Sequence, residues 1–124
     1  MAVQPVFIAA PQASGSATFI PAGTTVTSLL NQSSTQVGTV LNNGVARSNH
    51  TLLVITGTGV SGGVVTLVGS NDGTNFYTTS TTVTTSAAST VYAANLANFP
   101  FQYVAAKITT AITGGTITAE VTSC

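Results

Sequence analysis

The chain has 124 residues, of which two are basic, two are acidic, one is histidine and one is cysteine. Charged residues make up 3% of it, against about 25% in an average soluble domain, which excludes nucleic-acid binding driven by phosphate contacts. Hydrophobic residues make up 44%, so the length suits one domain with a real core, while no apolar run approaches the roughly 20 residues of a membrane-spanning helix.

Residues 1–23 contain three prolines with small residues between them. Because proline cannot donate a hydrogen bond to a sheet ladder, this segment is predicted to be an extended N-terminal arm or a set of edge strands. Its apolar patches would lie either over its own domain or over a neighbouring molecule. The candidate interface residues of the arm are Val6, Phe7, Ile8, Phe19 and Ile20.

Residues 24–124 show the pattern of one β-domain. Short runs rich in threonine, valine and isoleucine are separated by turn residues about every 8–12 positions, which is typical of a β-sandwich. No segment has the capping residues and periodicity of a helix. The expected fold is therefore all-β, a single antiparallel β-sandwich or jelly-roll-like domain preceded by the arm. Strands are expected over 24–30, 36–41, 52–55, 64–68, 76–84, 90–94, 101–112 and 116–122.

Three connections have distinctive sequences. The Asn-Asn-Gly run at 42–44 is a strong hairpin signal, because Asn and Gly adopt positive φ at low cost. The glycine-rich segment 57–63 is predicted to be a loop. Residues 70–75 form a predicted turn in which an Asp-Gly pair supplies the left-handed geometry, so Asp72 is interpreted as a structural residue.

The C-terminal residues are predicted to form a hairpin across Gly114-Gly115. This hairpin would pair Ile108 with Val121 and so match apolar with apolar residues. It would also place Lys107 and Glu120 on the same outer face, where they could form an ion pair across the strands. An exposed pair contributes at most about 1 kcal/mol, so we interpret it as a device that sets the register.

The inventory of chemical groups argues against catalysis. A general acid–base pair needs two titratable side chains within hydrogen-bond reach, and a nucleophile needs a base beside it. A zinc site needs about four ligands, and only His50 and Cys124 offer nitrogen or sulfur side-chain ligands. We therefore expect no enzyme activity, no cofactor and no metal, and we interpret His50 as a hydrogen-bonded loop residue.

The scarcity of charge predicts that the chain works in contact with other molecules. Free β-sandwiches protect their edges with charged residues and keep their net charge away from zero. Here the formal net charge is zero, and residues 78–86 form a long uncharged run of strand type. Arg47, one of the two bases, is a candidate for binding a carboxylate on a partner and completes the set of candidate interface residues.

Two segments resemble virion proteins of tailed bacteriophages. In residues 64–77, VVTLVGSNDGTNFY, a strand runs into a Gly-Ser-x-Asp-Gly turn and a following aromatic residue. Residues 101–108, FQYVAAKI, are similar to a later strand of the same modules, which is followed by a glycine-rich hairpin and a threonine-rich closing strand. The resemblance implies a small β-sandwich of the virion, and in particular a capsid decoration (cement) protein. Such proteins are commonly trimeric and bridge major capsid proteins on the outside of the shell.

The leading hypothesis is therefore a structural virion protein, a decoration subunit that stabilises an icosahedral shell by bridging capsomers. Its expected partners are the major capsid protein and other copies of itself in a homotrimer, with no nucleic acid and no membrane. Its expected location is the capsid surface, after assembly in the host cytoplasm.

Two alternatives remain open. The chain could be a tail-fibre or adhesin-type module that binds glycans through aromatic and hydroxyl side chains. It could also be a filament or tail-tube subunit, in which copies join into a polymer. The aromatic residues considered for a sugar platform are Tyr77, Tyr92, Phe99, Phe101 and Tyr103.

Overall fold

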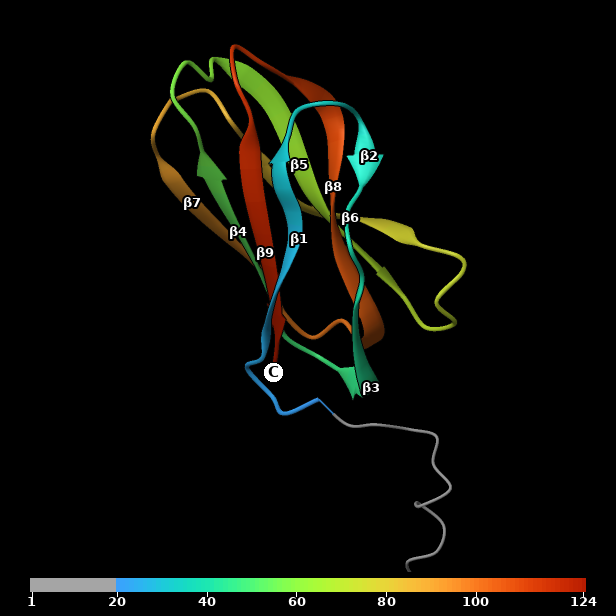
Figure 1. Cartoon of the computed structure of the whole chain (residues 1–124). Coiled ribbons are helices and arrows are strands. Elements are labelled where there is room, and N and C mark those ends of the chain that lie inside the picture. The colour runs from blue at the N-terminus through green and yellow to red at the C-terminus, as the bar shows by residue number, and fades with distance from the viewer. Residues whose placement is uncertain (1–19) are drawn as a thin grey trace, which may run out of the picture.

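The computed structural model describes residues 20–124, which form nine β-strands in two sheets (Figure 1). One sheet has four strands in the order β1-β9-β4-β7, and the other has five, in the order β2-β8-β5-β6 with β3 also paired with β8. The strands are β1 (Thr25–Gln32), β2 (Gln36–Val37), β3 (Leu41–Arg47), β4 (His50–Thr56), β5 (Gly62–Ser70), β6 (Tyr77–Thr84), β7 (Val91–Leu96), β8 (Phe101–Thr113) and β9 (Ile117–Ser123).

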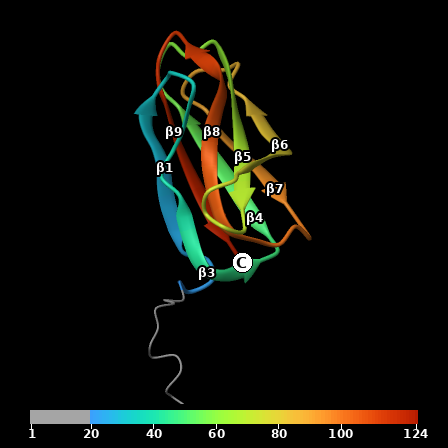
Figure 2. The same ribbon diagram turned by 90° about the vertical axis from the view of Figure 1, so that its right-hand side faces the viewer.

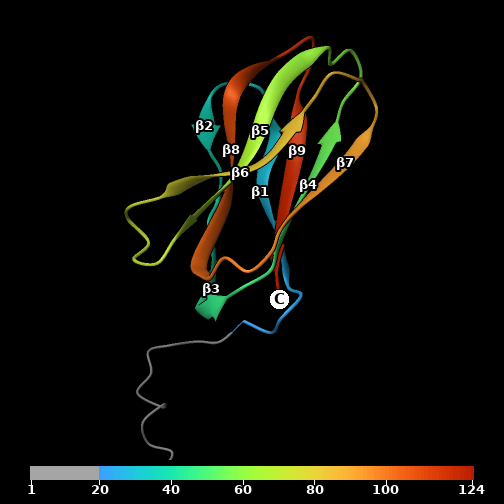
Figure 3. The same cartoon turned by 180° about the vertical axis from the view of Figure 1, so that it is seen from behind.

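Every strand pairing in these residues is antiparallel, and the two sheets pack face to face, which confirms the predicted antiparallel β-sandwich. Figures 1 and 2 show that the chain enters the sandwich at the same end at which the C-terminus lies. Seen from behind, the outer part of the β5–β6 hairpin extends away from the body of the sandwich (Figure 3).

The core forms where alternate residues of the two sheets meet. In the four-stranded sheet, Leu52 and Val54 of β4 lie beside Ala119 and Val121 of β9, and all four are fully buried. The opposite layer is supplied chiefly by β5 and β8, the pair of strands at the centre of the larger sheet. Because a fully buried Leu, Ile or Val contributes about 1.5–3 kcal/mol, burial of these alternate side chains is the main attraction between the two layers. The inward residues of β5 and β8 include Val65, Leu67, Val104, Ala106 and Ile108.

The predicted C-terminal hairpin is wrong in its pairing, because β8 and β9 belong to different sheets. Ile108 and Val121 do point inward and are fully buried, but they contribute to opposite layers of the core. Since their neighbours Lys107 and Glu120 point the opposite way along each strand, these two charges lie on opposite outer faces. The predicted cross-strand ion pair is therefore wrong as well.

The Gly114-Gly115 connection crosses between the sheets because another loop holds it there. The backbone N–H of Ser61 donates to the carbonyl of Thr113 at 2.9 Å, and that of Gly57 donates to the carbonyl of Thr116 at 2.9 Å. A side chain at Gly114 would overlap the carbonyl of Gly59, which lies 2.0 Å from the place of its Cβ. With these partners, the chain turns into the other sheet, where β9 pairs with both β1 and β4.

The predicted hairpin at 42–44 is also wrong, because these residues lie inside β3. Gly44 has a φ of 75°, and its N–H donates to the side-chain oxygen of Asn42 at 2.9 Å. The register of β3 against β8 shifts between Asn42 and Arg47, so the run forms an irregularity within an edge strand, as glycine with positive φ commonly does. The side chain of Asn43 is buried and donates to the carbonyl of Gln102.

The single strand predicted over 36–41 is divided by contacts with Ser28. The Ser28 hydroxyl donates to the carbonyl of Thr39 at 2.8 Å and accepts from the N–H of Ala106 at 2.9 Å. Gly38 passes so close that a Cβ there would lie 2.1 Å from the Ser28 carbonyl oxygen. Ser28 thus links β1 of the smaller sheet to β8 of the larger one, and the strand between them is interrupted.

Candidate interaction surfaces

The chemically distinctive side chains of the described residues are dispersed. Within 20–124, no group of three or more His, Cys, Asp and Glu lies together. Nor does this part of the chain contain a helix long and apolar enough to cross a membrane. The features that stand out are the end where the chain enters the sandwich, an aromatic cluster beside it, and single charges on the outer faces of the sheets.

Two of the predicted interface residues, Ile20 and Arg47, lie together at the entry end of the sandwich. Ile20 packs against the core, and its carbonyl accepts a hydrogen bond from Nη2 of Arg47. Further along, the N–H of Gly23 donates to the carbonyl of Ser123 at 2.9 Å. The end of the predicted arm is therefore bound to its own domain. The other four predicted interface residues, Val6, Phe7, Ile8 and Phe19, lie outside the described residues.

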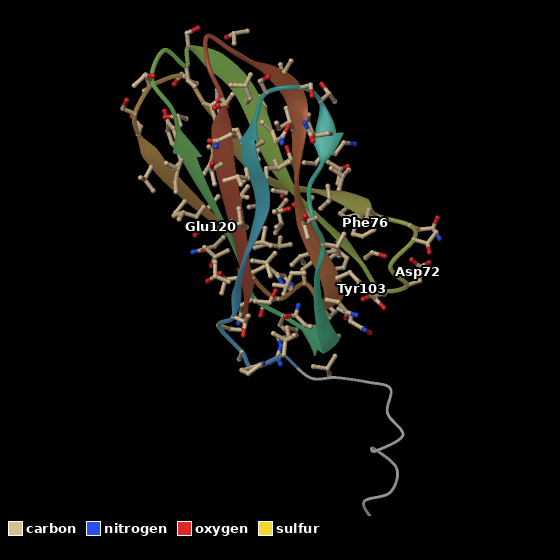
Figure 4. All side chains as sticks on the ribbon, in the orientation of Figure 1. Asp72, Phe76, Tyr103 and Glu120 are labelled. Carbon is tan, nitrogen blue, oxygen red and sulfur yellow. The ribbon has the colours of Figure 1, made fainter. Side chains whose placement is uncertain are left out.

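Arg47 keeps a charge that no nearby side chain of the domain neutralises. Its Nε atom is buried and has no hydrogen-bond partner among residues 20–124. The chain has two carboxylate side chains, Asp72 and Glu120; the first lies in the β5–β6 turn and the second in the middle of β9 (Figure 4). A guanidinium in this situation favours a carboxylate or carbonyl group brought by another molecule.

His50 is fully buried between two hydrogen-bond partners at the same end. Its Nε2 lies 3.0 Å from the carbonyl oxygen of Phe99, and its Nδ1 lies 2.7 Å from the hydroxyl of Ser123. Because a carbonyl only accepts, Nε2 carries the proton and Nδ1 accepts from the Ser123 hydroxyl. Burial lowers the pKa of His50, and backbone hydrogen bonds with Phe99 and Arg47 act in the opposite direction. The neutral imidazole thus connects β4, β9 and the β7–β8 loop.

Beside His50, aromatic rings form a continuous row from the core to the surface. The Phe101 ring lies 6.0 Å from that of His50 and 5.0 Å from that of Phe99, and Phe99 lies 5.8 Å from Tyr77, all between ring centroids. Phe101 is buried, whereas Tyr77 is 57% exposed and Phe99 is 38% exposed. The two outer rings are inclined by only 19°, so together they present an aromatic surface to solvent.

The other two aromatic residues considered for a sugar platform lie elsewhere. Tyr103 packs beneath the β5–β6 turn, where a Cβ on Gly73 would lie 3.1 Å from its ring. The hydroxyl of Tyr92 accepts from the N–H of Ala87 at 3.1 Å, in the β6–β7 connection. The sequence could name these aromatics, but only the fold shows that Tyr77 and Phe99 are the pair exposed side by side.

The Asp72 turn is explained by its own hydrogen bonds. The Asp72 carboxylate accepts from the backbone N–H groups of Thr74 and Asn75, each at 2.8 Å, and from the hydroxyl of Ser70 at 2.9 Å. The Asn75 side chain adds a fourth bond at 2.8 Å. These bonds hold the pKa of Asp72 well below its usual range. Figure 4 places Asp72 at the tip of the hairpin, in agreement with the structural role expected from the sequence.

Sequence reasoning missed a groove between β1 and β2, with a volume of about 400 Å³. Leu30 and Val37 line it and are exposed. Only the irregular alternation of apolar residues in this segment could have indicated it, because a regular sandwich strand would turn these side chains inward. The lining residues are Thr27, Ser28, Leu29, Leu30, Gln32, Gln36, Val37, Gly38 and Thr39.

Comparison with known proteins supplies a likeness of fold. No protein-family model matches this sequence, and no curated protein matches it. Among solved structures, the crystal structure of the SPBc2 prophage-derived protein YomS is similar, with a TM-score of 0.58 and 12% sequence identity. The superposition covers 86% of this chain and 97% of the other, so nearly the whole β-sandwich, and not one sheet alone, has the fold of that protein.

Proposed function

We propose that this chain is a structural protein of a bacteriophage particle, and more narrowly a decoration subunit on the capsid surface. The observation that carries the proposal is the fold shared with a prophage-derived protein over 97% of that protein's length. The proposed partners are the major capsid protein and other copies of the chain in a homotrimer, with neither nucleic acid nor membrane involved. The proposed role is mechanical, with no catalytic step and no cofactor.

The composition of the sheet edges supports a role in assembly. Four of the five edge strands, β1, β2, β6 and β7, contain no charged residue, and β3 contains one, Arg47 at its end, although edge charges are a common protection against unwanted strand pairing. The exposed side chains on β6 are largely threonine and serine hydroxyls. Such a surface is well suited to close contact with other neutral protein surfaces and poorly suited to permanent exposure at high concentration.

The entry end is the proposed contact with the shell. Ile20 and Arg47 hold the last residues before β1 against the domain. The arm is therefore attached to the sandwich at a fixed position. Val6, Phe7, Ile8, Phe19 and Ile20 would contribute by burial of apolar area, at about 25 cal/mol per Å². Arg47 would contribute by binding a carboxylate of the major capsid protein.

The direct test is to locate the chain in purified particles. Phage particles from the phage or prophage that encodes the chain are purified, analysed by mass spectrometry and labelled with gold-conjugated antibodies raised against the folded domain. We expect many copies per particle and label over the head. Label confined to the tail would replace the decoration role by the tail-fibre or tail-tube role, and absence from intact particles would overturn the virion assignment.

The exposed aromatic pair supports glycan binding as a second candidate function. Tyr77 and Phe99 are stacked at 5.8 Å and exposed, an arrangement against which a sugar ring can pack. If this function is correct, Tyr77→Ala abolishes binding on a glycan array, whereas Tyr92→Ala, a tyrosine outside the pair, leaves it unchanged. Equal binding by the wild type and both variants, or no binding by any of them, would contradict it.

A further inference from the structure

The outer face of the four-stranded sheet carries one charge near its centre. Glu120 lies between Ala119 and Val121, which are fully buried, so its side chain points outward. Its neighbours across the strands are Thr27 on β1 and Leu53 on β4. Both are uncharged, and β9 is an inner strand of this sheet. The carboxylate therefore stands within a neutral surface.

The outer face of the five-stranded sheet carries one charge of the opposite sign in the equivalent place. Lys107 lies between Ala106 and Ile108, which are fully buried, and it points outward for the same reason. Its neighbours across the strands are Val37 on β2 and Thr66 on β5. Like β9 in the other sheet, β8 is an inner strand. Neither cross-strand neighbour of the lysine is charged; Val37 is exposed, and Thr66 is buried.

The remaining charges of the chain are used elsewhere. Asp72 is bound within its turn, and Arg47 donates to Ile20 at the entry end. Glu120 and Lys107 are therefore the two charges that the outer faces present, one on each side of the sandwich. Because they point in opposite directions, they cannot neutralise each other within one molecule.

Exposed apolar side chains accompany each charge. On the smaller sheet, Ile55 and Val91 are cross-strand partners, 37% and 61% exposed. On the larger sheet, Val37 is 47% exposed beside Lys107. Two such faces could bury these side chains against each other, and stacked sheets lie about 10 Å apart, a gap that a glutamate and a lysine side chain can bridge together.

We propose that the outer face of the four-stranded sheet binds the outer face of the five-stranded sheet of a second copy, with Glu120 against Lys107. The inference rests on the self-association included in the proposed function and identifies the two surfaces. Contact between two identical faces would bring two glutamates or two lysines together, which charge repulsion opposes. A contact between unlike faces is heterologous, so it generates either a closed ring or an open stack.

The ion pair in this contact determines which faces meet, while apolar burial supplies most of the affinity. Charge reversal is therefore the sharpest test. Self-association of the full chain is measured by sedimentation velocity over a range of concentrations. We expect Glu120→Lys and Lys107→Glu each to weaken it about tenfold or more, because each brings like charges together. The double variant, with both charges exchanged, restores association.

A charge-matched control separates this contact from a general effect of net charge. Glu120→Gln and Asp72→Asn change the net charge equally, but Asp72 lies in the hairpin turn, away from the Glu120 surface (Figure 4). Glu120→Gln is expected to weaken association and Asp72→Asn to leave it unchanged. Circular dichroism checks that every variant is folded.

Three results would overturn the inference: a wild-type chain that stays monomeric, a double variant that fails to associate, or tighter association of Glu120→Gln, which indicates contact between two four-stranded faces. None of these results bears on whether the chain is present in phage particles, which the labelling experiment decides separately.

Discussion

His50 is the residue whose chemistry depends most on the fold. It accepts a hydrogen bond from Ser123 and donates one to Phe99 in a fully buried position. The fold therefore stabilises the neutral form of the imidazole. Burial lowers its pKa below the ordinary value of 6.5. As the pH falls below that value, the unfolded chain takes up a proton before the folded one, and stability decreases.

This linkage predicts that the free energy of unfolding is constant above about pH 7 and falls as the pH is lowered below about 6.5. Urea denaturation at several pH values measures it. His50→Gln, which cannot titrate, is expected to be less stable at neutral pH but to show a flat profile over this interval. A wild-type profile as flat as that of the variant would contradict the prediction.

Gly69 lies against the ring of Phe101, which leaves no room for a larger side chain at this position. A Cβ at Gly69 would lie 2.3 to 2.5 Å from atoms of the Phe101 ring, which is itself packed between His50 and Phe99. Gly69→Ala is therefore expected to destabilise the domain by about 1–3 kcal/mol through overpacking. In combination with Phe101→Leu, the loss should be smaller than the sum of the single losses. If urea denaturation shows that the stability losses of the two single variants simply add in the double variant, contact with the Phe101 ring is not the cause of the destabilisation.

At the scale of the strands, β1 is linked to the other sheet by the hydroxyl of Ser28. The Ser28 side chain bonds both Thr39 and the N–H of Ala106 in a buried setting. Removing it leaves a buried donor on β8 without a partner, which costs about 1–3 kcal/mol. Ser28→Ala should lose stability of this size in urea denaturation, whereas Ser80→Ala, at an exposed position on β6, should change it by less than about 0.5 kcal/mol. Equal losses in the two variants would contradict this role.

The last two strands show why pairing is harder to predict than burial. Alternation along β8 and β9 correctly indicated that Ile108 and Val121 point inward. It did not indicate that β9 would pair with β1 and β4, which lie far from it in sequence. A short glycine connection is compatible with a hairpin and with a crossing between sheets. The choice depended on the 57–61 loop that binds Thr113 and Thr116.

At the scale of the whole molecule, the arm and the domain can be separated experimentally. The described contacts that bind the chain at the entry end begin at Ile20, so deletion of residues 1–19 leaves them in place. We expect the shortened chain to remain folded and to bind shells more weakly than the full chain. Co-sedimentation with undecorated shells measures the binding, and unchanged affinity would exclude the arm as an anchor.

The sequence by itself determined the class of fold, the inward and outward faces of β8 and β9, and the Asp72 turn. Each of these depends on local chemistry: alternation with a period of two, or a side chain that bonds its own backbone. Only the tertiary structure decided that Tyr77 and Phe99 stack, that Ile20 meets Arg47, and that Glu120 and Lys107 occupy opposite faces. Those relations depend on which distant strands become neighbours, and many strands of similar neutral composition compete for each pairing. The sum of long-range contacts therefore selects the arrangement, and no single stretch of sequence contains it.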